Sequence, residues 1–269
     1  DQMQAIAAEM NLSETAFVSS SSSSEADYEL RIFTPNRELP FAGHPSVGTA
    51  FVLYEEGRFG KKASKFTVRQ QVKIGLLPIE IDPTADGVRV MATSGRPERG
   101  NACEDVEAAV SALGLRMGDV TGTGLPVEAS STGLQQMMVP VVSLDAVRTM
   151  KPDMRAVTDL ERAMGITGFA AFVLSSHGDA NVHMRFFTPA SGIAEDPATG
   201  SAAGALGAYL VRHGAVDVSE ETVRLVIEQG EEVRRPSRIE VEVEHEGGEP
   251  KVVRIGGASV TLMKGQILA

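Results

Sequence analysis

The sequence has few of the residues on which several functional classes depend. A single cysteine, Cys103, cannot form an internal disulfide, which indicates a reducing compartment, and we expect the cytoplasm. No apolar run approaches the length needed to cross a bilayer. The chain has 25 basic and 36 acidic residues, and the resulting net charge of −11 argues against a nucleic acid or a membrane surface as partner. A small anionic substrate is still compatible, because local N–H groups can hold it.

Motifs for metals and nucleotides are also missing. The five histidines, His44, His177, His183, His213 and His245, show no ligand spacing with acids or cysteine, so we expect no metal, and His177 with His183 to mark a surface hairpin. The stretch Gly122-Thr123-Gly124 lacks the third glycine and the following helix of a dinucleotide site, and we interpret residues 118–124 as a linker.

One pattern occurs twice and organises the chain. It reads HPSVGTA over residues 44–50 and DPATGSA over residues 196–202. Proline suits the first turn of a helix, and both stretches predict helix starts, for helices over 46–56 and 198–213. The free N–H groups and positive dipole end of each helix favour a carboxylate or a developing oxyanion. We therefore expect one shared pocket.

The similarity between the two halves extends beyond these helix starts. Arg31–Pro35 (RIFTP) aligns with Arg185–Pro189 (RFFTP) at an offset of 185 − 31 = 154. The sequence therefore predicts an α+β fold of two similar lobes from an internal duplication, each a strongly curved, mostly antiparallel sheet or barrel around a central helix. We place the lobes at residues 1–118 and 125–269.

The repeat also predicts the remaining elements. A strand over 137–142 has no counterpart in the first half, and the chain begins at Asp1 without a methionine, so we expect about 30 further residues before it. The serine run 19–24 is predicted to be a flexible hairpin loop. We also predict helices over 2–10, 104–113 and 154–164, strands over 28–33, 182–187 and 259–263, and a turn at Gly256-Gly257.

Positions that differ between the copies are candidates for chemistry, because duplicated scaffolds keep packing residues in both. His44 corresponds to Asp196, Thr49 to Ser201, and Glu14 has Phe169 as its nearest counterpart. Each residue taken singly has a structural alternative: Asp196 as a helix N-cap, His44 as a buried histidine, Glu14 as a polar strand entry, and Ser201 as a hydroxyl bonded to local backbone. Their coincidence at matched ends of a repeat favours a site.

These motifs resemble the PhzF family of phenazine-biosynthesis-like isomerases. The resemblance is carried by Ser13–Thr15, by Arg31–Pro35 with Leu39–Pro45, by Glu195–Ala202, and by Arg235–Ser237 with Ile255–Gly257, and it runs nearly end to end. It implies the diaminopimelate-epimerase-like fold, an active site between two lobes, no cofactor and a homodimer. It also implies that Glu14, His44, Asp196 and Ser201 line the site, with the glutamate moving a proton.

A cofactor-free isomerase must remove a proton from carbon and return it elsewhere, and a carboxylate can do both. Acting near neutral pH would require burial to raise the pKa of Glu14. The helix starts, represented by Gly43 and Ser46 and by Gly200 and Ala202, would bind a small anionic or amino-acid-like substrate. Asp196 and His44 would contact its amine or hydroxyl groups, and Ser201 would donate a hydrogen bond.

Two alternatives stay open at this point. An amino-acid epimerase or racemase of the same fold would need non-cysteine bases, because Cys103 lies away from both helix starts. A non-catalytic protein that only binds a small molecule would keep the same pocket.

Overall fold

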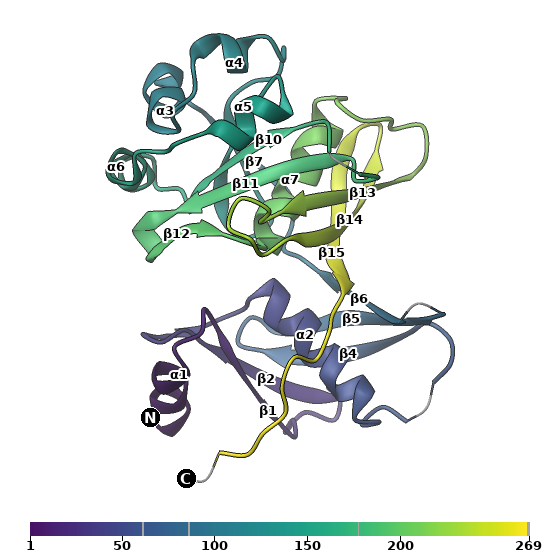
Figure 1. Cartoon of the computed structure of the whole chain (residues 1–269). Coiled ribbons are helices and arrows are strands. Elements are labelled where there is room, and N and C mark those ends of the chain that lie inside the picture. The colour runs from purple at the N-terminus through teal and green to yellow at the C-terminus, as the bar shows by residue number, and fades with distance from the viewer. Residues whose placement is uncertain (61, 86, 177, 268–269) are drawn as a thin grey trace. The chain divides into compact units, whose positions relative to one another are not determined.

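The chain forms a mixed fold of helices and strands in two compact units (Figure 1). The computed structural model describes residues 1–60, 62–85, 87–176 and 178–267. The first unit comprises Asp1–Thr93 and Gly256–Ala269, and the second comprises Ser94–Ile255. Among the described residues, no helix has both the length and the apolar composition that crossing a bilayer requires.

The first unit is a sheet with one long helix packed against it. Its elements are α1 (Gln2–Met10), β1 (Thr15–Ser19), β2 (Tyr28–Phe33), β3 (Glu38–Leu39), α2 (Gly43–Glu55), β4 (Phe66–Val72), β5 (Gly75–Thr84) and β6 (Gly87–Thr93). Helix α2 contacts β1, β5 and β6 and buries Ala50, Phe51 and Leu53 in the core of this unit. Ser20–Ser24 lie in the loop between the antiparallel strands β1 and β2, as the sequence predicts, whereas Ser19 is the last residue of β1.

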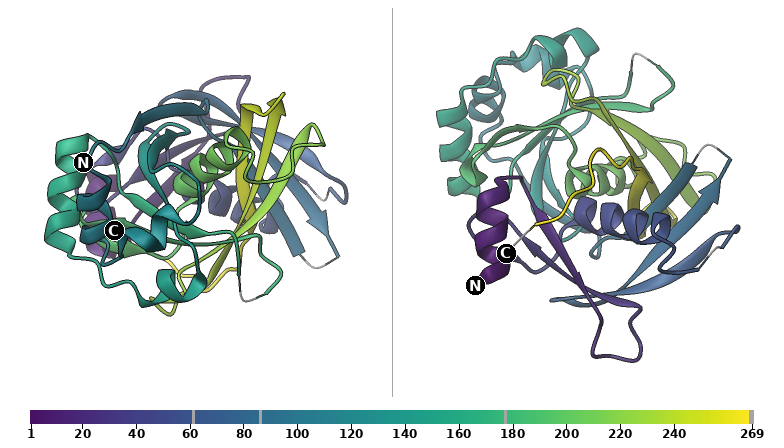
Figure 2. Two further views of the ribbon diagram at one scale, coloured as in Figure 1. Left: turned by 90° about the horizontal axis from the view of Figure 1, so that it is seen from above. Right: turned by 60° about the horizontal axis from the view of Figure 1, so that its bottom comes forward.

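The second unit surrounds its long helix with strands (Figure 2). Its elements are β7 (Glu98–Ala102), α3 (Val106–Ala112), α4 (Met117–Thr121), β8 (Glu128–Ser131), β9 (Gln135–Pro140), α5 (Leu144–Thr149), α6 (Met154–Met164), β10 (Phe169–Val173), β11 (Val182–Thr188), η1 (Pro189–Ser191), β12 (Ile193–Asp196), α7 (Gly200–Arg212), β13 (Thr222–Gln229), β14 (Ser237–Glu246) and β15 (Glu249–Ala258), whose last residues belong to the first unit. Helix α7 contacts β8, β9, β13 and β14, and the small residues of its sequence allow these strands to approach closely.

The two units share one strand order. It runs β1-β2-β4-β5-β6 in the first unit, with β3 paired to β2, and β10-β11-β13-β14-β15 in the second, with β12 paired to β11. The registers also correspond, since Thr15 pairs with Phe33 and Phe169 pairs with Phe187, each residue 154 positions from its counterpart (169 − 15 and 187 − 33). Strand β9 pairs in parallel with β10, and the described part of the first unit has no strand in the matching place beside β1.

The compact units differ from the lobes expected at 1–118 and 125–269. Strand β7 pairs with β8, and α3 packs against α4 and α6, which places all of them in the second unit. The expected linker 118–124 is wrong in its first part, because α4 covers Met117–Thr121 and buries Val120 in the core of the second unit.

The end of the chain also departs from the prediction. Gly256 and Gly257 do not form a turn, because they lie within the continuous strand β15. A side chain at position 256 would begin 1.9 Å from the carbonyl oxygen of Val90, so only glycine allows this close approach to β6. The predicted strand over 259–263 is absent from the described residues, and Val260, Leu262 and Met263 are exposed there.

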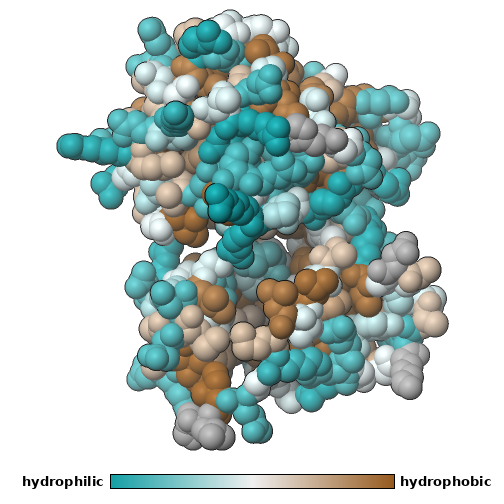
Figure 3. Space-filling view, in the orientation of Figure 1, coloured by the Kyte–Doolittle hydropathy of each residue, from teal (hydrophilic) through white to brown (hydrophobic). Residues whose placement is uncertain are grey.

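Hydrophilic side chains cover much of the face that Figure 3 shows. They are spread over both units, and hydrophobic side chains lie in separate small groups. Charged residues are paired in several places, including Arg31 with Glu38 at 2.8 Å and Lys65 with Glu80 at 2.5 Å.

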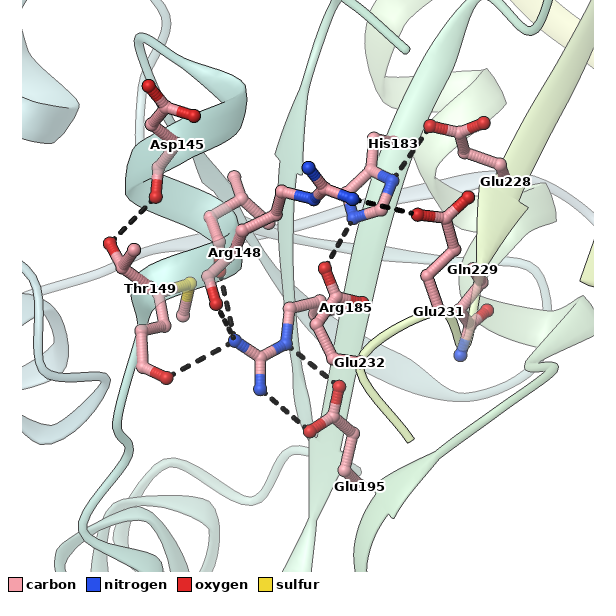
Figure 4. Close-up of polar contacts among 12 residues, drawn as sticks. Asp145, Arg148, Thr149, His183, Arg185, Glu195, Glu228, Gln229, Glu231 and Glu232 are labelled. Carbon is pink, nitrogen blue, oxygen red and sulfur yellow. Dashed lines mark hydrogen bonds and ion pairs between the residues drawn. The ribbon is translucent and has the colours of Figure 1, made fainter. Parts of the chain in front are cut away.

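His183 is not on a surface hairpin, as the sequence predicted, but is fully buried on β11 (Figure 4). His177 lies outside the described residues. Both ring nitrogens of His183 have carboxylate partners: Nδ1 is 2.8 Å from Glu228 and Nε2 is 2.9 Å from Glu232. All seven residues of β11 are buried, so a polar residue in this strand needs such partners.

The pair of carboxylates makes the stability of the protein depend on pH. Burial lowers the pKa of His183, but Glu232 and Glu228 outweigh it and raise the pKa above the ordinary value of 6.5. The resulting stabilisation is fully present below pH 6.5 and is lost as the pH rises through the raised pKa of His183.

We expect the free energy of unfolding to fall over this pH range more steeply in the native protein than in His183→Gln. Urea unfolding at several pH values measures both slopes, and equal slopes would contradict the assignment.

Candidate functional site

In the first unit, Glu14 and His44 lie side by side. Glu14 immediately precedes β1, and His44 is in the first turn of α2. His44 Nε2 is 3.1 Å from Glu14 Oε2, with side chains 51% and 16% exposed respectively. The Oε2 atom is buried and has no well-aligned hydrogen bond within the described residues. His44 is therefore not the buried structural histidine that the sequence left open, and its half-exposed ring is paired with a mostly buried carboxylate.

The pKa of Glu14 is lowered, whereas the sequence led us to expect a raised pKa. Burial by itself raises it, but His44 and the Ser13 side chain stabilise the carboxylate more strongly, so the pKa of Glu14 lies below its ordinary value of 4.5. The resting residue is therefore a carboxylate at neutral pH. In an acid–base reaction, Glu14 would therefore accept a proton before it donates one.

The start of α2 is fixed by buried hydrogen bonds. Ser46 donates to the carbonyl oxygen of Ala42 at 2.8 Å and accepts from Gln70 at 2.9 Å, and Gln70 accepts from the Tyr28 hydroxyl at 2.9 Å. The Ser46 hydroxyl is thus fully engaged inside the unit, and its contacts are those of a positioning group. The main-chain N–H groups of Gly43 and His44 have no acceptor within the helix, as at any helix start.

In the second unit, Asp196 ends β12 and leads into α7. Its Oδ2 accepts from the Thr199 hydroxyl at 2.5 Å, and its carbonyl oxygen accepts from Gln229 at 2.6 Å. Gln229, fully buried at the end of β13, also accepts from the Thr199 N–H at 3.0 Å. Asp196 is not the N-cap of α7, because the cap residue is Thr199, so the capping alternative is wrong.

Ser201 is the second residue of α7. Its Oγ accepts a hydrogen bond from Gln136 Nε2 at 2.9 Å, so it is bonded to a side chain of β9. Gly200 lies before it, and a side chain at 200 would begin 2.9 Å from Ile255. Ala202 follows, with its methyl group in the core. The predicted binding groups at Gly200 and Ala202 are therefore main-chain N–H groups.

Both long helices begin at residues other than those predicted. Helix α2 begins at Gly43 and not at Ser46, so Pro45 occupies its third position, where an N–H would also be unpaired. Helix α7 begins at Gly200 and not at Ala198, so Pro197 lies outside it. The helix therefore starts just before the shared pattern in the first copy, at Gly43, and inside the pattern in the second copy, at Gly200.

These two helix starts differ from the capped helices of the second unit. Asp105, Ser143 and Asp153 each accept a hydrogen bond from a first-turn N–H of α3, α5 and α6. Within the described residues, the N-cap residues of α2 and α7, Ala42 and Thr199, make no such side-chain bond. Their first-turn N–H groups are therefore available to an anion.

The structural counterpart of Glu14 is Gly168. Thr15 and Phe169 hold equivalent register positions, so Glu14 matches the residue before Phe169 and not Phe169 itself, as the sequence alignment suggested. Gly168 has a φ of +111°, and a side chain there would begin 2.5 Å from Phe186. The second unit therefore has no carboxylate at the matching position.

An arginine on β11 holds β12 in place (Figure 4). Arg185 donates two hydrogen bonds of 2.8 Å to Glu195, the residue before Asp196, and its remaining nitrogen donates to the carbonyl oxygens of Val147 at 2.9 Å and Met150 at 3.2 Å. The same arrangement occurs in the first unit, where Arg31 is paired with Glu38. Each arginine also lies over a phenylalanine ring, at 5.0 Å from Phe187 and 5.1 Å from Phe33.

Sequence reasoning missed the glutamines that support the site. The sequence analysis assigns no role to Gln136 or Gln229, although both side chains are buried and bond to the start of α7. A polar residue inside an apolar strand was the available signal, because a buried amide needs partners.

Comparisons with known proteins identify the family. Residues 1–265 match the family model for phenazine biosynthesis-like protein. An uncharacterized isomerase of Clostridium acetobutylicum is 32% identical, over 99% of this chain and 88% of that protein. The trans-2,3-dihydro-3-hydroxyanthranilate isomerase of Pseudomonas aeruginosa is 33% identical over the same shares. The crystal structure of a Bacillus anthracis phenazine biosynthesis protein of the PhzF family superposes with a TM-score of 0.86 and 30% identity, covering 100% of this chain and 89% of that one. The chain therefore belongs to the phenazine biosynthesis-like protein family and is an isomerase of the PhzF type.

Proposed function

We propose that this isomerase works without a cofactor and moves a proton between two carbons of a small carboxylic acid, with Glu14 as acid and base. The observation that carries the proposal is the Glu14 carboxylate, which is mostly buried and whose Oε2 lies 3.1 Å from His44 Nε2. The lowered pKa keeps Glu14 ionised at neutral pH, and the ionised form is the one that can take a proton.

In the proposed reaction, Glu14 takes a proton from a substrate carbon next to an unsaturated group. The electron pair of the broken C–H bond moves into that group, and the protonated Glu14 then returns the proton to a different carbon. Atoms and charge balance without a further reactant. His44 steers the proton, because its imidazole contacts the same carboxylate oxygen.

The substrate carboxylate would bind at an uncapped helix start. The N–H groups of Gly200, Ser201 and Ala202 and the Ser201 hydroxyl supply donors at the start of α7. Asp196, whose carboxylate bonds to Thr199, would accept a hydrogen bond from an amine or hydroxyl of the substrate. Gly43 would supply an equivalent N–H at α2.

The proposal extends to the origin of the fold. We infer that the two units arose by duplication of one ancestral unit. The shared strand order, the registers at one offset and the repeated arginine, glutamate and phenylalanine arrangement support this inference. On this view, Glu14 is an addition specific to the first copy.

The relatives named trans-2,3-dihydro-3-hydroxyanthranilate isomerases suggest the first substrate to test. That compound carries a carboxylate, an amine, a hydroxyl and unsaturated ring carbons, which are the groups that the proposed residues would contact. The test is incubation with the protein in D₂O, with deuterium at the ring carbons followed by NMR. Isomerisation or deuterium exchange is the expected result. Binding without either would favour a protein that only binds the acid.

A further inference from the structure

Among the described residues, Gln136 makes a side-chain hydrogen bond through its amide nitrogen and none through its amide oxygen. The residue lies on β9 with 1% of its surface exposed. Its Nε2 donates to Ser201 Oγ at 2.9 Å, while its buried Oε1 has no partner within the part of the chain that the structure describes. A buried amide oxygen without a partner costs stability, because it has lost its hydrogen bonds to water.

The bond that Gln136 does make determines what Ser201 can do. A serine hydroxyl has one proton to donate and two lone pairs to accept. Gln136 Nε2 can only donate, so it occupies a lone pair and leaves the Ser201 proton free. Ser201 lies in the first turn of α7, beside N–H groups that also only donate. The Ser201 hydroxyl and the first-turn N–H groups of α7 can therefore all act as donors, which suits an anionic oxygen.

An apolar side chain would serve a purely structural purpose better. Methionine has nearly the length of glutamine and would fill the same buried space without an unsatisfied oxygen. The amide of Gln136 differs from such a side chain in the hydrogen bond that it donates to Ser201.

We propose that Gln136 is a positioning residue that orients the Ser201 hydroxyl as a donor to the carboxylate of the bound acid. The inference rests on the proposed function, because it assumes that the start of α7 binds that carboxylate. Gln136 acts only through Ser201.

The variant Gln136→Met separates this role from a structural one. We expect an unchanged or higher melting temperature, because the unsatisfied oxygen is removed. We also expect the affinity for anthranilate, a stable acid with a carboxylate and a neighbouring amine, to fall about 10-fold, as for loss of a well-aligned hydrogen bond to a charged group. Isothermal titration calorimetry and differential scanning calorimetry measure the two quantities. Gln135→Met is the matched control, since adjacent side chains of a strand point to opposite faces, and its affinity should equal that of the native protein.

A double-mutant cycle tests whether Gln136 acts through Ser201. We expect Ser201→Ala to weaken anthranilate binding at least as much as Gln136→Met, and the double variant to bind no more weakly than Ser201→Ala alone. Independent losses that add would overturn the proposal, as would a Gln136→Met variant that melts lower and binds normally.

The charged variant Gln136→Glu supplies a pH signature. An ionised glutamate would accept the Ser201 proton and repel the substrate anion, whereas a protonated one would donate as glutamine does. Binding of anthranilate to Gln136→Glu should therefore recover as the pH falls, while the native protein shows no such recovery. The same pH profile in both proteins would contradict the assigned role.

Measurements on the native protein distinguish a failure of the Gln136 inference from a failure of the proposed function. A native protein that binds anthranilate but exchanges no substrate proton would refute proton transfer and leave the role of Gln136 intact. A native protein that does not bind anthranilate would refute the carboxylate site at α7, and the role of Gln136 with it.

Discussion

Replacing Glu14 by glutamine should lower the rate of proton transfer by about 10²–10⁴-fold, the usual contribution of general acid–base catalysis. Glutamine has the same shape but cannot accept and return a proton. Glu14→Gln should still fold and bind the substrate, because Glu14 lies outside the core of the first unit, and the lost pairing with His44 is only partly shielded from solvent. The rate of deuterium exchange into the substrate, measured by NMR at saturating concentration, gives the effect directly. Glu25→Gln, at an exposed loop position of the same unit, is the matched control.

The pH profile provides a second measurement on the same residue. Because the pKa of Glu14 is lowered, the acidic limb of kcat/KM should lie below pH 4.5 in the native protein. In His44→Gln the imidazole no longer favours the carboxylate, while burial still raises the pKa, so the limb should move to higher pH. An unshifted limb in that variant, or full exchange activity in Glu14→Gln, would exclude Glu14 as the base.

Among the variants proposed for this protein, Arg185→Met should lower the free energy of unfolding the most. Its side chain is 7% exposed and its partner Glu195 is 11% exposed, so Arg185→Met leaves a nearly buried carboxylate unpaired. Breaking such a pair costs about 3–5 kcal/mol. The carbonyl oxygens of Val147 and Met150 lose their donor as well. Urea unfolding should show a lower midpoint, and the loss of restraint on β12 should also weaken ligand binding near Asp196.

The repeat provides the control for this experiment. Arg31 makes the same two hydrogen bonds to Glu38 and lies over Phe33, but its side chain is 44% exposed. Solvent screens an exposed pair, so Arg31→Met should change the unfolding midpoint far less than Arg185→Met. Equal effects of the two variants would show that burial does not determine the energy of this ion pair.

Much of the fold could be predicted from the sequence, because hydrophobic periodicity and turn residues report local structure. Helices α1 and α6 and strand β2 have the predicted bounds, and Asn11 ends α1 in the left-handed conformation. The errors lie where tertiary contacts override local signals. The glycines around 118–124 indicated a linker, yet Val120 packs into a core and α4 forms. Gly256 indicated a turn, yet it allows close approach of β15 to β6.

The candidate site could be predicted only for the residues whose chemistry is visible in a motif. Glu14 and His44 were recognised because the two copies differ there, and the structure brings them into contact. The direction of the Glu14 pKa was wrong, because it depends on how His44 and burial compare in strength, which no spacing reveals. Gln136 and Gln229 were missed because their partners, Ser201 and Thr199, lie far away in the sequence.

Gly168 has a consequence for the reaction. Its backbone conformation and the 2.5 Å approach to Phe186 prevent the second unit from carrying a side chain where the first carries Glu14. A single substitution cannot place a carboxylate at this position, so the second unit has no base that corresponds to Glu14. In the proposed reaction, one carboxylate therefore both removes and returns the proton. Part of a substrate deuterium should therefore be carried from one carbon to the other instead of being lost to solvent.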